Sequence, residues 1–243
     1  MEHSIFWFRM YGMNEIETNK GNEIETFTLQ KISDSVKHRL EAINEEFRAG
    51  MNAVTKYDRS VTFFGSARTI DGDEDYANAK ELGRRISQEL GYVVTTGGAG
   101  GIMAAANRGA FEAGGKSLGL TIRLPKEQTT NHFINEQVDF KYFFVRKVCL
   151  SFSAETYIYF PGGFGTMDEL FEILTLVQTK KIPAVPVILF GKKFWSKFDD
   201  FIKNVLLDDN KISADDRKLY TITDSIDEAI EIIKQAPIRT ALY

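Results

Sequence analysis

Three glycine-rich turns constrain the fold of this chain more than any other feature, because each directly follows a short apolar segment. The apolar segments are 61–64, 92–95 and 156–160. Their β-branched and aromatic residues predict strands, and a helical pattern of apolar residues begins after each turn. Strands separated by helices require right-handed crossovers, and hence a mostly parallel sheet covered on both faces. We therefore predict an α/β fold over residues 60–243, a Rossmann-like, doubly wound sheet in a single domain.

The same alternation extends over the rest of this region. We expect strands at 61–64, 92–95, 117–122, near Phe140, at 156–160 and at 185–190. We expect helices from about Tyr76 to Leu90, at 102–113, through Arg146 and Leu150, at 167–178, around 194–206 and at 225–233. Ligands of parallel sheets bind beyond the carboxyl ends of the strands, where the three glycine turns would converge on one pocket.

Residues 1–59 differ in composition from the rest, with three glycines and no proline. The duplicated segments 14–18 and 22–26 predict a short polar hairpin or a mobile arm. From residue 34 to 56, apolar residues recur every three or four positions, which predicts an amphipathic helix that lies across the main domain or a partner subunit. We expect an N-terminal arm and helix at 1–59 and a nucleotide-binding domain at 60–243.

Composition excludes several function classes. The 243 residues are 43% hydrophobic, with a net charge of −4 and both signs interspersed. This balance argues against a nucleic-acid partner or an anionic membrane surface, and no stretch is long enough to span a bilayer. The single Cys149 excludes a disulfide within one chain, fits a cytoplasmic location and is expected to be a buried, inert thiol. The three histidines lack metal-ligand spacing, so we expect no metal.

The third turn has the sequence of an anion site. Gly162, Gly163 and Gly165 let backbone amides approach a ligand, and a helix expected to begin at Thr166 would direct its positive end to the same point. Neither familiar nucleotide loop matches, because Gly115-Lys116-Ser117 lacks the upstream glycine of a P-loop and no turn supplies the third glycine of a dinucleotide fingerprint. The sequence therefore predicts a site for a mononucleotide-like phosphate.

Two carboxylates, Asp168 and Glu169, follow this turn and indicate chemistry beside the phosphate. A structural alternative is a capping box, in which Thr166 accepts from the Glu169 amide and the Glu169 side chain reaches back. The aromatic residues Phe143, Phe144 and Phe171 are expected in the core rather than stacked on a base.

The segment Pro161–Glu169 resembles the P-G-G-x-G-T-x-x-E motif of the LONELY GUY (LOG) family, cytokinin-activating nucleoside 5′-monophosphate phosphoribohydrolases formerly called possible lysine decarboxylases. Gly65-Ser66, the 97–103 turn and the Arg146-Lys147 pair fit the same pattern. The resemblance covers roughly residues 61–195. It departs at Asp168, where many members have Glu, and in the longer terminal extensions.

The resemblance implies hydrolysis of an N-glycosidic bond without a cofactor, releasing a free base and ribose 5-phosphate. Such cleavage passes through an oxocarbenium-like sugar, which an anionic carboxylate stabilises, and Glu169 is the candidate. Arg146 could hold the phosphate or ribose or fix that carboxylate, with Lys147 and Asp168 in support. The candidate phosphate- and nucleotide-binding residues are Gly65, Ser66, Gly97, Gly98, Gly101, Met103, Gly162, Gly163, Gly165 and Thr166.

The resemblance also implies a homodimer or a larger assembly of dimers. The apolar stripe of residues 34–56 and the face formed by Leu170, Ile173, Leu174 and Val177 are the candidate surfaces for a second subunit.

Two other functions stay open on the sequence. A non-catalytic nucleotide or cofactor carrier or sensor could use the same fold, although it would not require the Arg146 and Glu169 pair. An amino-acid decarboxylase would need pyridoxal phosphate on a Schiff-base lysine, and no lysine lies in a recognisable setting for it.

Overall fold

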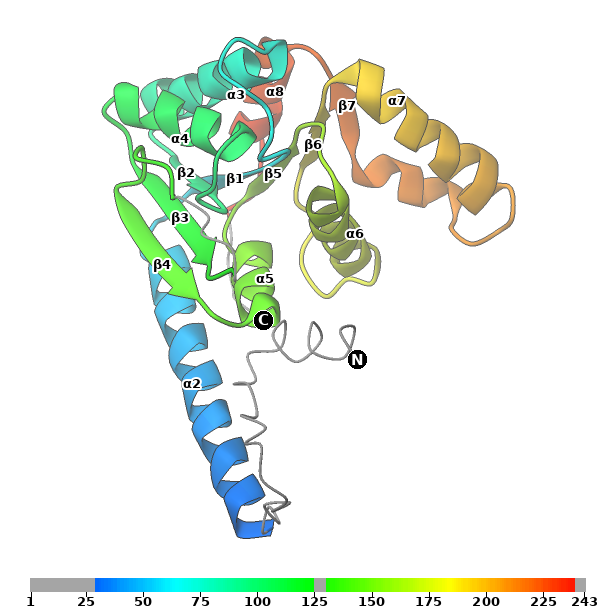
Figure 1. The fold of residues 1–243 in the computed structure, drawn as a ribbon. Coiled ribbons are helices and arrows are strands. Elements are labelled where there is room, and N and C mark those ends of the chain that lie inside the picture. The colour runs from blue at the N-terminus through cyan, green and yellow to red at the C-terminus, as the bar shows by residue number, and fades with distance from the viewer. Residues whose placement is uncertain (1–28, 125–129, 239–243) are drawn as a thin grey trace, which may run out of the picture.

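The structure, a computed structural model, describes residues 29–124 and 130–238, with side chains from residue 34 onward. The duplicated segments 14–18 and 22–26 lie outside the described residues. Within these ranges seven parallel strands form one sheet in the order β4-β3-β2-β1-β5-β6-β7 (Figure 1). The strands are β1 (Ser60–Phe64), β2 (Val93–Thr96), β3 (Ser117–Ile122), β4 (Glu136–Phe140), β5 (Thr156–Tyr159), β6 (Val187–Phe190) and β7 (Thr221–Thr223). The predicted Rossmann-like α/β fold is confirmed.

Helices cover both faces of this sheet. They are α2 (Leu29–Thr55), α3 (Glu74–Arg85) with the π-helical turn η1 (Ile86–Leu90), α4 (Ile102–Glu112), α5 (Phe143–Ser151), α6 (Phe164–Gln178), α7 (Lys192–Phe201) with the π-helical turn η2 (Ile202–Leu207), the 3₁₀ helix η3 (Ala214–Leu219) and α8 (Ile226–Lys234). None of the helices in the described ranges is both long enough and apolar enough to cross a membrane.

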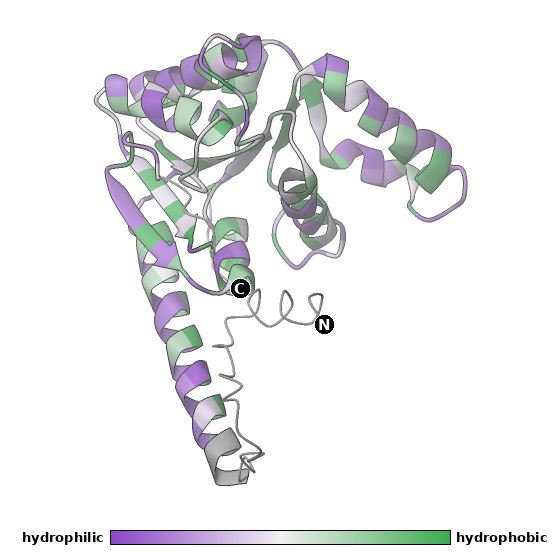
Figure 2. Cartoon of the chain, in the orientation of Figure 1, coloured by the Kyte–Doolittle hydropathy of each residue, from purple (hydrophilic) through white to green (hydrophobic). Residues whose placement is uncertain are grey.

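Two hydrophobic clusters form the core, one on each face of the sheet. Along β1 the side chains alternate, so that Val61 and Phe63 pack beneath α3, α4 and α8 while Phe64 packs towards α5, α6 and α7. In Figure 2 the central strands are largely hydrophobic, whereas polar residues interrupt the helices around them. Burial on both faces accounts for the continuous apolar runs of these strands.

The chain reverses its direction of travel across the sheet between β1 and β5. From β1 it proceeds through β2 and β3 to β4 at one edge, and after α5 it returns to β5 on the other side of β1. The loops that follow β1 and β5 therefore leave the sheet in opposite directions and open a crevice. Such a switch point is where open parallel sheets bind ligands.

Helix α2 packs on the sheet through its C-terminal half only. Ile43, Phe47 and Met51 are partly buried against the core, whereas Val36 and Leu40 expose 50% and 55% of their surface. In Figure 1 the N-terminal half of this helix extends beyond the domain. The division at residue 59 and the homodimer stay predictions.

The apolar face of α6 is not an open surface for a second subunit. Leu170, Ile173, Leu174 and Val177 are all buried in this chain's own core. Of the two surfaces predicted for a dimer, only the exposed stripe at Val36 and Leu40 is left.

Several local expectations were wrong. Helix α6 begins at Phe164, two residues before the predicted start, and the short strand β7 was missed because its Thr-Ile-Thr sequence lacks an apolar run. Phe143 and Phe144 are each 49% exposed and Phe171 is 40% exposed, although all three were expected in the core. Consecutive helical residues cannot share one face, and the fully buried Val145 takes the inward position on α5.

Cys149 matches its expected environment. Cys149 lies on α5, and its fully buried side chain packs against Gly50 of α2. Burial raises the pKa of the Cys149 thiol to about 12, so the thiolate is scarce at neutral pH.

Candidate functional site

A cavity of about 640 Å³ opens at the switch point between β1 and β5. It receives residues from the ends of three strands and from three helices. Its lining consists of Phe64, Gly65, Ser66, Ala67, Arg68, Gly97, Met103, Arg146, Gly163, Phe164, Gly165, Thr166 and Glu169. The glycine turns after β1, β2 and β5 thus converge, as the parallel topology requires.

The loop after β1 holds the other two turns in place. The Ser66 amide donates to the Pro161 carbonyl at 3.0 Å, and the Ser66 carbonyl accepts from the Ile102 amide at 3.0 Å. Gly101 has φ of +65°, and a Cβ there would collide with the Ser66 carbonyl. Only glycine tolerates both the positive φ and the close approach of the Ser66 carbonyl. The start of α4 is therefore held beside the loop after β1.

The first turn of α6 presents unpaired backbone amides to the cavity. Gly163 is the N-cap residue, so the amides of Phe164, Gly165 and Thr166 have no helical carbonyl to bond. All four residues line the cavity. These amides and the positive end of the helix give a surface suited to an anion, without Cβ obstruction at Gly163 and Gly165.

The capping-box interpretation of Thr166 and Glu169 is wrong. Thr166 is the third helical residue rather than the cap, and no side chain caps the helix at Gly163. The Thr166 side chain instead lies over Gly162, where a Cβ would collide with its hydroxyl. Glu169 is therefore free of a capping role.

Arg146 and Glu169 form a buried pair on the wall of the cavity. The Arg146 Nη1 atom lies 3.9 Å from Glu169 Oε1, and the two side chains are 13% and 15% exposed. The Arg146 Nε donates to the Leu120 carbonyl at 2.6 Å, and its Nη2 lies so close to Gly97 that a Cβ there would collide with it. The Tyr159 hydroxyl donates to the Glu169 carbonyl at 3.1 Å, which fixes this turn of α6.

Burial shifts both members of the pair towards their neutral forms. It raises the pKa of Glu169 to about 7, although the positive charge of Arg146 opposes this change. Burial also lowers the pKa of Arg146, with Glu169 in opposition. A carboxyl group with a pKa near neutrality can accept or donate a proton under ordinary conditions, as a general base or acid must.

Lys147 and Asp168 are adjacent to this pair in sequence but do not line the cavity. The Lys147 Nζ atom lies 2.8 Å from Asp168 Oδ1 and 3.3 Å from Glu172 Oε2. Burial would lower the pKa of Lys147, but its hydrogen bond to Asp168 and the charge of Glu172 raise it. The Lys147 amine is thus held as a cation.

The structure brings together nine of the fourteen residues singled out in the sequence. The cavity is lined by Gly65, Ser66, Gly97, Met103, Arg146, Gly163, Gly165, Thr166 and Glu169. Outside the lining are Gly98, Gly101, Gly162, Lys147 and Asp168. The sequence reasoning missed Phe64, Ala67, Arg68 and Phe164, although Arg68, as a cation two residues after the first glycine turn, was a usable signal.

The lining also bears on cofactors. No lysine is among the described residues that line the cavity, so it supplies no amine for a Schiff base with pyridoxal phosphate. Among all the residues that the structure describes, no group of three or more His, Cys, Asp or Glu side chains is arranged to hold a metal ion.

Comparison with known proteins relates the chain to one family. Residues 103–233 match the family model described as "Possible lysine decarboxylase". Over 183 residues the chain is 24% identical to a probable cytokinin riboside 5′-monophosphate phosphoribohydrolase of Oryza sativa subsp. japonica, covering 73% of this chain and 77% of the relative. It is 25% identical over 179 residues to a cytokinin riboside 5′-monophosphate phosphoribohydrolase of Arabidopsis thaliana, covering 73% and 77%.

Solved structures share the fold. A structural genomics target is 27% identical with a TM-score of 0.56, covering 73% of this chain and 99% of that one. The molybdenum cofactor carrier protein of Chlamydomonas reinhardtii is 24% identical with a TM-score of 0.52, covering 74% and 98%. At that identity the second likeness concerns the fold alone.

Proposed function

The chain belongs to the LOG-type family described as possible lysine decarboxylase, and from its site we propose that it hydrolyses the N-glycosidic bond of a nucleoside 5′-monophosphate. The substrate is AMP or an N6-substituted AMP, and the products are the free base and ribose 5-phosphate. The buried Arg146–Glu169 pair beside an anion-binding helix start is the observation that carries this proposal. Two relatives bear the name of such a hydrolase, which supports the same reaction class.

The phosphate is assigned to the first turn of α6. The amides of Phe164, Gly165 and Thr166 supply donors, and no described carboxylate side chain other than Glu169 lines the cavity. Arg68, also in the lining, adds a positive charge from the loop after β1. The sugar then extends along the wall towards Gly97, which brings the anomeric carbon to Arg146 and Glu169.

Glu169 is assigned as the base and electrostatic stabiliser. Water adds to the anomeric carbon and gives its proton to the Glu169 carboxylate, while the bond to the base nitrogen breaks and its electron pair leaves with the base. Glu169 then releases the proton to solvent and the departing base takes one up, which restores the carboxylate and yields the free base. The ionised carboxylate also stabilises the positive charge that develops on the sugar ring. A pKa of about 7 leaves about half of Glu169 ionised at neutral pH.

Arg146 is assigned to the carboxylate rather than to the phosphate. Its Nε is committed to the Leu120 carbonyl and its guanidinium lies between Glu169 and Gly97. From this position its charge lowers the pKa of Glu169, while Nη2 is left to meet a ribose hydroxyl.

A substrate comparison tests the proposal. Purified protein is incubated with AMP and with adenosine, and the free base is separated by chromatography. We expect AMP to yield adenine and adenosine to yield at least a hundredfold less, because only AMP reaches the α6 amides. Equal turnover of the two would contradict the phosphate assignment.

The carrier function is the alternative outcome of the same experiment. Structures on this fold include a molybdenum cofactor carrier protein. Tight binding of AMP with no release of adenine by the wild-type protein would reject hydrolysis and favour a carrier or sensor. Release of adenine that Glu169→Gln abolishes would reject the carrier.

A further inference from the structure

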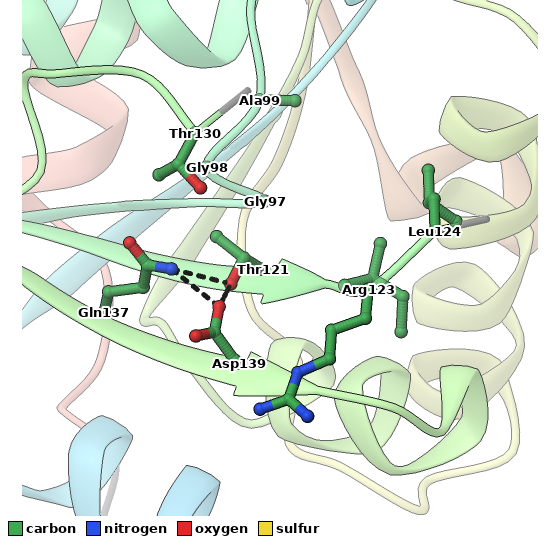
Figure 3. Close-up of a pocket in the computed structure, with 10 residues that line it drawn as sticks. Gly97, Gly98, Ala99, Thr121, Arg123, Leu124, Thr130, Gln137 and Asp139 are labelled. Atoms are coloured by element: carbon green, nitrogen blue, oxygen red, sulfur yellow. Dashed lines mark hydrogen bonds between the residues drawn. The ribbon is translucent and has the colours of Figure 1, made fainter. Parts of the chain in front are cut away.

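A second cavity, of about 340 Å³, lies beside the first along the carboxyl edge of the sheet (Figure 3). It occupies the ends of β2, β3 and β4, and Gly97 lines both cavities. Its lining consists of Gly97, Gly98, Ala99, Thr121, Ile122, Arg123, Leu124, Thr130, Gln137 and Asp139. The nucleotide assignment above makes no use of it.

The polar groups of this second cavity form an ordered arrangement. Thr121 and Asp139 are paired residues on β3 and β4, and the Thr121 hydroxyl donates to Asp139 Oδ1. Gln137 Nε2 donates to the same oxygen at 2.6 Å. In Figure 3 the amide nitrogen of Gln137 points at Asp139 and its oxygen points away.

Around Asp139 these hydrogen bonds leave acceptors rather than donors available, and the donor side chains elsewhere in the lining are Arg123 and Thr130. Asp139 Oδ2 has no hydrogen-bond partner among the described residues, and the Gln137 amide oxygen has none either. The hydrogen bond from Thr121 lowers the pKa of Asp139, so its carboxyl group is an anion at neutral pH and can only accept. A ligand group that fits this arrangement carries N–H donors.

The position of the second cavity matches one part of the proposed substrate. Phosphate at α6 and the anomeric carbon beside Arg146 put the base past Gly97, on the side away from α6. A side chain at Gly97 would collide with Arg146, and one at Gly98 would collide with Thr121, so the ridge between the cavities consists of bare backbone. A nucleotide can lie across that ridge.

We propose that the second cavity binds the base of the nucleotide and that Asp139 selects a base with an exocyclic amine over one with a carbonyl at the same position. Asp139 accepts a hydrogen bond from the amine of adenine. The 6-oxo group of hypoxanthine would instead bring a second acceptor against the carboxylate. This inference rests on the proposed function, because it uses the phosphate position assigned there.

The test compares AMP with IMP in wild-type protein, Asp139→Asn and Asp139→Ala. Hydrolysis gives kcat/KM, and calorimetry of the Glu169→Gln protein, with and without Asp139→Asn, gives Kd. We expect the wild type to prefer AMP by at least about a hundredfold, and Asp139→Asn to reduce that preference at least tenfold, mainly through KM and Kd. The control Asp58→Asn removes an exposed carboxylate that precedes β1, at the opposite end of the sheet, and should leave the preference unchanged.

The outcomes separate this inference from the proposed function. If Asp139 only holds Thr121 and Gln137 in place, its variants lose activity on AMP and IMP equally, and an unchanged preference overturns the inference. If neither nucleotide is hydrolysed but wild-type protein binds AMP over IMP and Asp139→Asn does not, the proposed function fails and the base site stands.

Discussion

Two ion pairs join the same two helices through adjacent residues, yet their environments are opposite. Arg146 and Glu169 are 3.9 Å apart and buried in the cavity wall, whereas Lys147 and Asp168 are 2.8 Å apart, with Asp168 62% exposed. The shorter pair is hydrated, and such pairs contribute about 0–1 kcal/mol. The longer pair is largely withdrawn from water without gaining a close contact, and burial displaces both of its pKa values towards the neutral forms.

The difference teaches that the shortest ion pair is not the best candidate for a functional pair. A buried carboxylate left partly uncompensated destabilises the fold, and such costs concentrate at sites where a reactive group is needed. The charge of Lys147 is satisfied by Asp168 and Glu172. Glu169 stays available to a ligand.

Glu169→Gln should have the largest effect. The substitution keeps the size of the side chain but removes its charge and basicity, so kcat for release of adenine from AMP should fall by about a hundredfold or more. Steady-state kinetics measures this loss, and binding of AMP shows whether the site is intact. Survival of activity would show that another group acts as the base, and the contrast between the two ion pairs would then have no bearing on catalysis.

Arg146→Ala should have the next largest effect. Without the guanidinium, only the weaker effect of the Lys147 charge opposes burial, so the pKa of Glu169 rises further and less carboxylate is ionised at neutral pH. We expect turnover at pH 7 to fall about tenfold and the midpoint of the pH–rate profile to move to higher pH. Arg146→Lys, which restores a charge without the planar fork, is the matched control. An unchanged midpoint in Arg146→Ala would show that Arg146 does not influence the pKa of Glu169.

Stability should also depend on pH through Glu169. Its folded pKa of about 7 lies above the ordinary value of 4.5, so the fold favours the protonated carboxyl. This contribution is fully present below pH 4.5 and is lost as pH rises through 7, by up to about 3 kcal/mol. Denaturant unfolding of the wild type and of Glu169→Gln at pH 5 and pH 8 measures it. The variant should become the more stable of the two at pH 8, and a constant difference between them would contradict the assigned burial of the charge.

Lys147→Met and Asp168→Asn should have the smallest effects. Each breaks a hydrated pair outside the cavity, so kcat should stay within about threefold of the wild type and the free energy of unfolding within about 1 kcal/mol. The same kinetic and unfolding measurements apply. A loss in Lys147→Met that matched that of Arg146→Ala would show that both basic residues of α5 serve the site.

The sequence by itself determined the fold and the place where the three glycine turns meet. Short apolar runs that alternate with helices predict strands of a parallel sheet buried on both faces. Parallel strands bring all their carboxyl ends to one edge of the sheet. The glycines after β1, β2 and β5 therefore had to meet. The run from Pro161 to Glu169 also predicted the strand, the glycine turn and the helix that follows it, because strand, glycine and helix signals are local.

Only the tertiary structure decided what each residue near that edge faces. The spacing of Thr166 and Glu169 fits a capping box and a catalytic turn equally, and the start of α6 at Phe164 excluded the first. Likewise Arg146 and Lys147 are interchangeable in sequence, but only Arg146 points into the cavity. Asp139 carried no local signal, because its partners Thr121 and Gln137 meet it through strand register and side-chain orientation, which are set by packing across the whole sheet.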